Sequence, residues 1–313
     1  MRLAVASGKG GTGKTTIATG LALSLAEDGG DPPPIFVDCD VEAPNAHLFL
    51  KPRSEQRRTV GIPIPVVDEA RCTYCGKCSE VCEYHAIAVL GKKTLVFPQL
   101  CHGCGSCTAQ CPERAISEMP DPIGVVERGP AVAGIDFLRG VLDIGQPMAV
   151  PIIRELKAWI SPAPGQPVIV DCPPGASCPV VAALRGADAA LLVTEPTPFG
   201  LHDLKQVAKI AAELNLPAGV IVNRDNGPYP KLEHFCHSSN LPILLRIPFE
   251  REIAAGIAQG RTLTEIHPEY ISSLREAFER LKYHLNNLGE DGGVRAATPP
   301  AHPRPPFCRD DTD

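Results

Sequence analysis

The sequence predicts an α/β fold in which a mostly parallel β-sheet is flanked by helices and interrupted by a small α+β insert. Short apolar runs alternate with helical patterns on both sides of the insert, which is typical of βαβ units. Between about 60 and 120 the helical periodicity disappears, and cysteine, glycine and short Val/Ile runs dominate. We therefore expect a discontinuous domain at 1–59 and 121–288, an insert at 60–120, and a disordered tail at 289–313.

Composition narrows the class of protein. The chain has 313 residues, of which 44% are hydrophobic and 21% charged, so it can form a packed core. Its net charge of -6 disfavours a generally basic nucleic-acid binder. No apolar run approaches the roughly 18 residues of a membrane span, and no secretory signal is visible. Eight of the 13 cysteines form two regular arrays, which in a cytoplasmic protein indicates metal binding rather than disulfides.

The elements are expected in the following order. A strand at 2–7, a helix at 15–27 and a strand at 35–37 form the first βαβ unit, and the Gly- and Pro-rich stretch at 28–34 ends its helix. Apolar residues at three- and four-residue steps predict an amphipathic helix near 271–288, whose mixed polar face favours packing on the protein over membrane binding. The other predicted elements are helices at 147–160 and 201–214 and strands at 168–170, 191–193 and 220–222.

The loop after the first strand matches the phosphate-binding pattern G-x-x-x-x-G-K-[ST] in the strand–loop–helix context that this pattern requires. Its glycines allow backbone N–H groups to point at phosphate oxygens, and the helix N-terminus favours the same anion. Lys14 is expected to reach the β- and γ-phosphates and Thr15 to ligate Mg²⁺. The nucleotide-binding residues expected here are Gly8, Lys9, Gly10, Gly11, Thr12, Gly13, Lys14, Thr15 and Thr16.

A second lysine in the loop, Lys9, is not needed for an ordinary phosphate loop. The run from Lys9 to Thr16 resembles the deviant Walker A ATPases, which include MinD, ParA, the nitrogenase iron protein and the Mrp-type ATPases. The resemblance implies a nucleotide-sandwich dimer, with a second copy or a paralogous ATPase, in which Lys9 reaches the phosphates of the partner. The simpler alternative is that Lys9 only adds local positive charge.

Acidic residues follow two of the predicted strands. Asp38 and Asp40 are two positions apart and therefore point the same way. By resemblance, Asp40 orients the attacking water and is catalytic together with Lys9 and Lys14, whereas Asp38 supports the Mg²⁺ shell. Asp171 opens a segment similar to the Walker B and switch II region and would hold Mg²⁺ through water. Each aspartate alone would also fit a strand-end cap.

Asn223 and Arg224 follow another strand, at the position where the family contacts adenine. An Asn amide can both donate to and accept from the adenine edge, although Asn at a strand end is also an ordinary turn residue.

Two cysteine runs with the spacing C-x₂-C-x₂-C-x₃-C are typical of bacterial two-cluster ferredoxins. In that pattern the fourth cysteine of each run ligates the other cluster. The predicted ligands of the first [4Fe-4S] cluster are Cys72, Cys75, Cys78 and Cys111, and those of the second are Cys101, Cys104, Cys107 and Cys82. Zinc is the competing interpretation, but two full runs and Pro112 after the last cysteine favour iron–sulfur. Glu83, and not proline, follows Cys82.

The cysteines outside the runs carry weaker signals. Cys39 and Cys172 adjoin strand-end aspartates and are expected to fill the core. Cys178 lies where the nitrogenase iron protein has one ligand of a bridging cluster, but no cysteine between 111 and 172 matches the second ligand. It is either part of such a site or a packed cysteine. His85 and His102 are expected to be hydrogen-bonding or solvent-facing residues rather than iron ligands.

Both parts together resemble MinD-superfamily ATPases with an inserted ferredoxin domain, over about residues 1–288. The resemblance implies ATP, Mg²⁺ and two [4Fe-4S] clusters, with slow ATP hydrolysis stimulated by a partner. Our leading hypothesis is a dimerisation switch that couples nucleotide state to electron transfer with an unidentified redox partner. The alternatives are an iron–sulfur or metal-cofactor assembly scaffold or carrier, working with a cofactor-assembly partner, and a positioning ATPase of the MinD or ParA kind.

Overall fold

The computed structural model describes residues 1–27 and 32–290, with the side chains of the last helix described as far as Tyr283. Residues 28–31, within the stretch expected to end the first helix, and residues 291–313 of the expected tail lie outside the described part of the chain.

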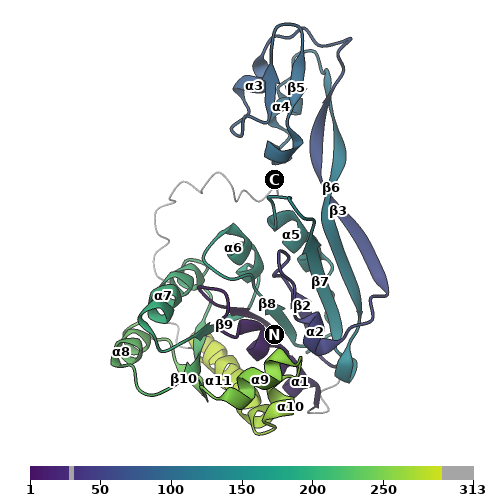
Figure 1. Cartoon of the computed structure of the whole chain (residues 1–313). Coiled ribbons are helices and arrows are strands. Elements are labelled where there is room, and N and C mark those ends of the chain that lie inside the picture. The colour runs from purple at the N-terminus through teal and green to yellow at the C-terminus, as the bar shows by residue number, and fades with distance from the viewer. Residues whose placement is uncertain (28–31, 291–313) are drawn as a thin grey trace.

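A nine-stranded sheet forms the centre of the molecule, in the order β11-β10-β9-β1-β8-β2-β7-β6-β3 (Figure 1). From β11 to β7 all neighbours are parallel, which confirms the expected mostly parallel sheet. These strands are short and buried on both faces, as parallel strands covered by helices are. Their bounds are β1 (Arg2–Ala6), β2 (Ile35–Asp38), β7 (Asp136–Leu142), β8 (Val168–Asp171), β9 (Ala189–Thr194), β10 (Ala218–Asp225) and β11 (Ile243–Pro248).

Helices cover both faces of this sheet and bury two apolar layers. On one face α1, α10 and α11 pack residues such as Ile17, Leu274 and Phe278 against the strands. On the other face α5 to α8 contribute Ile152 and Leu204, among others. The helix bounds are α1 (Lys14–Glu27), α2 (His47–Leu50), α5 (Val150–Ala158), α6 (Cys178–Leu184), α7 (Pro198–Glu213), α8 (Pro230–Ser238), α9 (Arg251–Ala258), α10 (Leu263–Ile266) and α11 (Tyr270–Glu290).

A long antiparallel hairpin, β3 (Gln56–Val67) and β6 (Ile116–Pro130), continues the sheet beyond its parallel part. Residues 124–130 of β6 pair with β7, whereas residues 116–122 pair only with β3. The hairpin therefore starts inside the main sheet and then projects away from it (Figure 1). The division that we expect at 60 and 120 falls within these two strands, so the hairpin belongs to both parts of the chain.

Residues 68–115 form a small lobe at the far end of the hairpin (Figure 1). The lobe is built from two similar halves. Gly76 and Gly105 have φ of +83° and +70°, and a one-turn helix follows each of them. Only glycine adopts such angles without strain, which explains the glycine in each cysteine run. The elements are α3 (Lys77–Glu80), β4 (Ile87–Val89), β5 (Thr94–Val96), the 3₁₀ turn η1 (Pro98–Leu100) and α4 (Ser106–Ala109).

Within the described residues, no helix has the length and apolar character needed to cross a membrane.

A substitution in the stacked pair Phe36–Phe137 tests the packing of the apolar layer between the sheet and α1. The two rings lie 5.7 Å apart on neighbouring strands, and both side chains are at most 2% exposed. We expect Phe137→Ala to lower the free energy of unfolding by about 3–5 kcal/mol, because it removes apolar contact and leaves a cavity. Chemical denaturation measures this loss, and Phe249→Ala, at a side chain that is 61% exposed, is the matched control. Equal losses for the two variants would contradict the packing described here.

Candidate functional site

The phosphate-binding pattern lies between β1 and α1, at the edge where the parallel strands end. At two of its positions only glycine fits, because atoms of neighbouring residues occupy the place of a Cβ. A Cβ at Gly8 would lie 2.2 Å from the carbonyl oxygen of Asp203, and one at Gly13, where φ is +89°, would lie 2.2 Å from Nδ2 of Asn223. The loop is thus held against α7 and β10. A Cβ at Gly10 or Gly11 would meet no atom within 4 Å, so this side of the loop is open to a ligand.

Lys14 carries a buried positive charge at this edge. Its Nζ donates to Oδ1 of Asp171 at 2.6 Å, with side-chain exposures of 6% and 0%. Burial lowers the pKa of Lys14, but the charge and hydrogen bond of Asp171 outweigh burial, so the pKa is raised overall. Thr15 and Thr16 follow in the first turn of α1 and are half-buried. The lysine is therefore held protonated beside a carboxylate.

Asp38 and Asp171 are register partners on β2 and β8, and both are fully buried. Asp38 accepts hydrogen bonds from the backbone N–H groups of Asp40 and Ala46, each at 3.1 Å. Burial, and then the charge of Asp171, raise the pKa of Asp38 to about 7. Burial also raises the pKa of Asp40 to about 6. Oδ2 of Asp171 is buried and has no hydrogen-bond partner among the described residues.

Asn223 and Arg224 end β10 beside the loop. Asn223 donates from Nδ2 to the carbonyl oxygen of Thr12 at 2.7 Å. Arg224, with φ of +53°, donates from Nη1 to Oε1 of Glu195 at 2.7 Å. The structure therefore brings Asn223 into contact with the phosphate loop, whereas Arg224 contacts Glu195.

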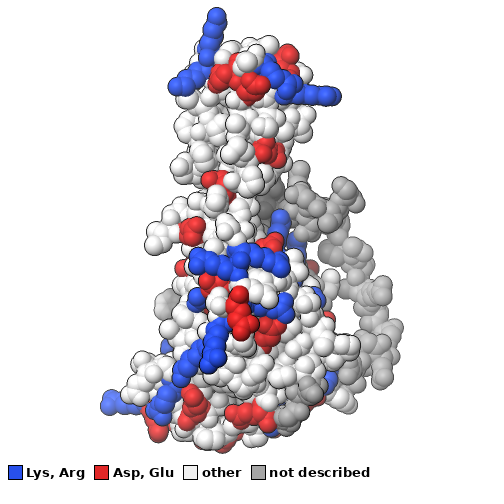
Figure 2. Space-filling model, turned by 90° about the vertical axis from the view of Figure 1, so that its right-hand side faces the viewer, with Lys and Arg blue, Asp and Glu red and all other residues white. Residues whose placement is uncertain are grey.

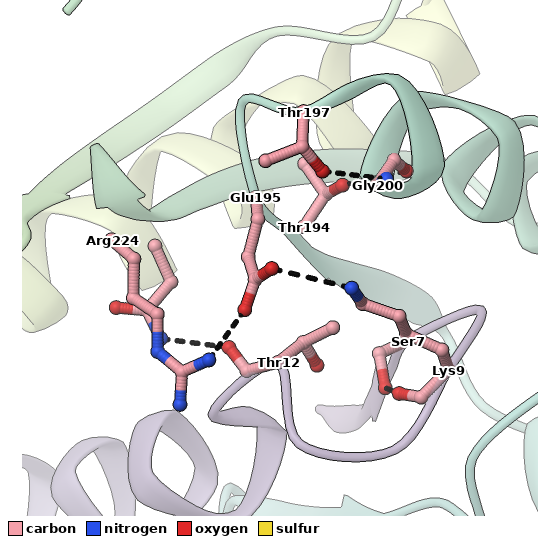
Figure 3. Close-up of polar contacts among 9 residues, drawn as sticks. Ser7, Lys9, Thr12, Thr194, Glu195, Thr197, Gly200 and Arg224 are labelled. Atoms are coloured by element: carbon pink, nitrogen blue, oxygen red, sulfur yellow. Dashed lines mark hydrogen bonds and ion pairs between the residues drawn. The ribbon is translucent and has the colours of Figure 1, made fainter. Parts of the chain in front are cut away.

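Glu195 is a central member of the site that our sequence analysis did not select. Its other carboxylate oxygen, Oε2, lies 3.3 Å from Nζ of Lys9, so one carboxylate bridges Lys9 and Arg224 (Figure 3). The side chain is 12% exposed. The available signal was its position, because Glu195 directly follows β9, the strand between β1 and β10. A glutamate after a strand has many ordinary uses, so position alone was not decisive.

The cysteines of the two runs gather around two small cavities of the lobe, each of about 20 Å³. Each cavity combines three cysteines of one run with the fourth cysteine of the other. The first is lined by Cys72, Cys75, Cys78 and Cys111, and the second by Cys101, Cys104, Cys107 and Cys82. Tyr84 and His102, which line the second cavity, stack with ring centroids 3.6 Å apart.

Backbone N–H groups point at several of these sulfur atoms. Ala86 donates to Sγ of Cys82 at 3.2 Å, and Ala115 donates to Sγ of Cys111 at 3.3 Å. These two bonds are equivalent in the two halves of the lobe. Among the described side chains, no three His, Cys, Asp or Glu residues are grouped so that they could hold a single metal ion.

The other cysteines lie outside the lobe. Cys39 and Cys172 are fully buried next to Asp38 and Asp171, as expected for core residues, and burial raises the pKa of both thiols. Cys178 begins α6 and is partly exposed. Cys308 lies outside the described residues.

The buried pair of Lys14 with Asp171 predicts a pH-dependent loss of stability. Lys14→Met leaves Asp38 and Asp171 without their cation, which costs about 3–5 kcal/mol when both are ionised. The raised pKa of Asp38, about 7 against a usual 3.8, means that the folded state retains a proton and loses stability as pH rises through this window. Without the Lys14 cation, ionising the buried carboxyl groups costs the folded state more. Lys14→Met should therefore lower the free energy of unfolding more at pH 8 than at pH 5.

Denaturation curves at the two pH values measure this difference. Lys282→Met, at an exposed pair with Glu279, is the control and should change stability little at either pH. A loss of stability for Lys14→Met that is the same at both pH values would contradict the description of the site.

Comparison with known proteins identifies the fold and the family. The sequence profile of the CobQ/CobB/MinD/ParA nucleotide binding domain (CbiA) matches residues 3–263. Two uncharacterized proteins of Methanocaldococcus jannaschii are similar. MJ0578 is 28% identical over 90% of this chain and 96% of its own length, and MJ0579 is 33% identical over 72% of this chain and 80% of its own.

Solved structures show the same fold. The cell division ATPase MinD of Pyrococcus furiosus is 20% identical and aligns with a TM-score of 0.54 over 90% of this chain and 98% of its own. MinD of Pyrococcus horikoshii, solved in complex with Mg-ADP, is 21% identical, with a TM-score of 0.51 over 95% and 99% of the two chains. The chain therefore belongs to the CobQ/CobB/MinD/ParA nucleotide-binding domain family and has its P-loop ATPase fold.

Proposed function

We propose that this chain binds and hydrolyses ATP with Mg²⁺, associates with a second copy in response, and so controls one-electron transfer through two [4Fe-4S] clusters in the lobe. The observation that carries the proposal is the crossed pattern of the cysteines. Cys111 lines the first cavity and Cys82 the second, although each belongs to the other run. This exchange is what the two-cluster ferredoxin pattern demands.

The nucleotide half of the proposal assigns one task to each residue. Lys14 would exchange Asp171 for phosphate oxygens, and the carboxylate released in this way would hold Mg²⁺ through water together with Asp38 and the Thr15 hydroxyl. The unpartnered buried Oδ2 of Asp171 supports this role, because a buried carboxylate oxygen is costly without a donor or cation. Asp40 would orient the attacking water.

Two further assignments concern contacts with a second copy of the chain and with the adenine ring. Lys9 would contact the phosphates bound by a second copy of the chain, and Asn223 and Arg224 would contact adenine. The position of Asn223 against the carbonyl oxygen of Thr12 supports a link between the base and the phosphate loop.

The chemistry of the cysteine sites fits iron–sulfur clusters. When bound, such clusters supply one-electron redox chemistry. The cavities are lined by four sulfur atoms each, and the N–H groups of Ala86 and Ala115 donate to the crossing cysteines. N–H donors stabilise thiolates and tune cluster potentials. Thiolates around a cubane surround a core larger than one ion, so the lack of a single-ion group among the described side chains is compatible with this assignment.

The main sheet connects the two halves of the proposed mechanism. Asp38 ends β2, β2 pairs with β7, β7 with β6, and β6 with β3. The lobe follows directly from the last two strands (Figure 1). A shift of the carboxylate edge on nucleotide binding can therefore reach the lobe through hydrogen-bonded strands rather than through a flexible linker.

The surface of the hairpin and lobe is compatible with a protein partner. Figure 2 shows charged side chains at the tip of the lobe and on the body, with a mostly uncharged surface between them. Large apolar side chains of this region are 40–64% exposed, and exposed apolar groups of this kind mark interaction sites. They are Val66, Leu90, Phe97, Leu100 and Met119.

One observation favours the assembly alternative. Cys75 and Cys104 are exposed, so one ligand of each set is accessible to an acceptor. Incubation of the loaded protein with an apo-ferredoxin separates the two functions, since a carrier transfers its iron and sulfide and a redox protein retains them.

A positioning role rests on the fold alone, and co-sedimentation with lipid vesicles or DNA in the presence of ATP tests it.

Cysteine variants test the ligand sets. Cys72→Ser and Cys111→Ser should each damage the same cluster and leave the other largely intact, and the double variant should lose no more iron than the single ones. Iron analysis and EPR of anaerobically prepared protein measure this, with Cys236→Ser, a buried cysteine outside the lobe, as the control. Loss of two distinct signals in the double variant would contradict the crossed assignment.

Rates of electron transfer test the coupling. Reduced protein is mixed with a viologen acceptor in the presence of Mg²⁺ with ATP, with ADP or without nucleotide. We expect ATP to change the rate several-fold in the wild-type chain, because it alters the sheet edge from which the hairpin continues. Lys14→Met should abolish the response. Equal rates under all three conditions would refute the coupling and leave the nucleotide and cluster assignments to their own tests.

A further inference from the structure

The bridge from Lys9 through Glu195 to Arg224 is not explained by the proposed chemistry. Its three residues come from the ends of neighbouring strands, since β9 lies between β1 and β10 in the sheet. The carboxylate of Glu195 is the most buried of the three groups, at 12% exposure against 34% for Lys9 and 51% for Arg224. The carboxylate is thus the buried centre of the bridge, and the two cations reach it from more exposed positions (Figure 3).

Local packing fixes the backbone on both sides of the Lys9–Glu195 contact. A Cβ at Gly200 would lie 2.3 Å from the carbonyl oxygen of Glu195, and Thr197 caps α7 by accepting a hydrogen bond from the N–H of Gly200 at 3.0 Å. On the loop side, the Ser7 hydroxyl donates to the carbonyl oxygen of Lys9 at 2.8 Å. A change at this contact is therefore made by the side chains, of which Lys9 is the more exposed, at 34% against 12% for Glu195.

The loop side of this contact is also connected to the segment after Asp171. The N–H of Gly175 donates to the carbonyl oxygen of Ser7 at 3.0 Å. The backbone that presents Lys9 is thus tied to the same segment that begins with the carboxylate bound to Lys14.

We propose that Glu195 is a positioning residue that holds Lys9 within its own subunit and so restrains association with a second copy of this chain. The inference rests on the proposed nucleotide-dependent association. The Lys9 ammonium has three N–H donors, but its side chain is directed at Glu195 of its own subunit and has to turn away from this carboxylate to reach a phosphate bound by a second copy. Association must break one partly exposed ion pair in each subunit, while Arg224 remains to balance Glu195.

Dimerisation of Glu195→Gln tests this restraint. Glutamine keeps the shape and an acceptor oxygen for Arg224 but loses the charge that holds Lys9. In sedimentation experiments with a non-hydrolysable ATP analogue and Mg²⁺, the dimer dissociation constant of the variant should be about three- to tenfold lower than that of the wild-type chain. The reason is that the two Lys9–Glu195 ion pairs, one in each subunit, no longer have to break. The matched control is Glu213→Gln, which removes an exposed pair with Lys209 on the same helix, α7, and should change nothing.

A zero-length carbodiimide cross-link between Lys9 and Glu195 gives a second readout that does not depend on dimerisation. Mass spectrometry should find the cross-link in protein without nucleotide and show its loss with the ATP analogue and Mg²⁺. The exposed pair Lys209–Glu213 is the internal standard. A Lys9–Glu195 cross-link that persists at the same yield with nucleotide, or that is absent without it, would overturn the restraint.

The outcomes separate this inference from the proposed function. If the wild-type chain associates with nucleotide and Glu195→Gln associates equally well, the restraint is wrong and the switch stands. If Glu195→Gln also strengthens dimerisation in a Lys9→Ala background, Glu195 acts through Arg224 or through its charge alone. The claim that it acts by holding Lys9 is then wrong. If the wild-type chain binds the analogue but never associates, the proposed switch itself is refuted.

Discussion

The buried contact between Lys14 and Asp171 is the interaction on which the site depends. The parallel strands end at one edge of the sheet, and their order places Asp38 and Asp171 side by side with no solvent around them. Burial, and then the charge of Asp171, raise the pKa of Asp38, so this pair of carboxylates is costly in the fold. Lys14 offsets this cost with a single ammonium group. In the proposed function, a ligand that engages Lys14 would also supply a cation for the acids, and the phosphate loop would thereby tie nucleotide binding to Mg²⁺.

The hairpin of β3 and β6 joins the main sheet to the cysteine lobe. The lobe is not held by a flexible linker, because β6 pairs with β7 of the main sheet and β3 pairs with β6 along the hairpin, with one irregularity between Val60 and Gly61. The lobe repeats one pattern twice, with a glycine of positive φ before each short helix and an N–H donated to the last sulfur of each run. This arrangement supports our proposal that one chain combines nucleotide control with redox chemistry.

Local chemistry made part of this structure predictable from the sequence. The phosphate loop, β1, α1 and β2 followed from a motif with strict backbone demands and from buried apolar runs. The hairpin was missed because Pro63, Pro65 and Pro120 suppress a strand pattern, yet an edge strand tolerates proline where no partner needs its N–H. Glu195 was missed for a different reason. Its role depends on three strand ends that meet only in the folded sheet, and no spacing along the chain reveals that meeting.

Iron and acid-labile sulfide analysis, combined with ATP binding on the same anaerobic preparation, decides whether one chain carries both activities. We expect about eight iron and about eight sulfide ions per chain, four of each for every cubane, in protein that also binds ATP in a magnesium-dependent manner. Zinc in place of iron, or iron-loaded protein without affinity for ATP, would contradict the claim that one chain joins the two activities.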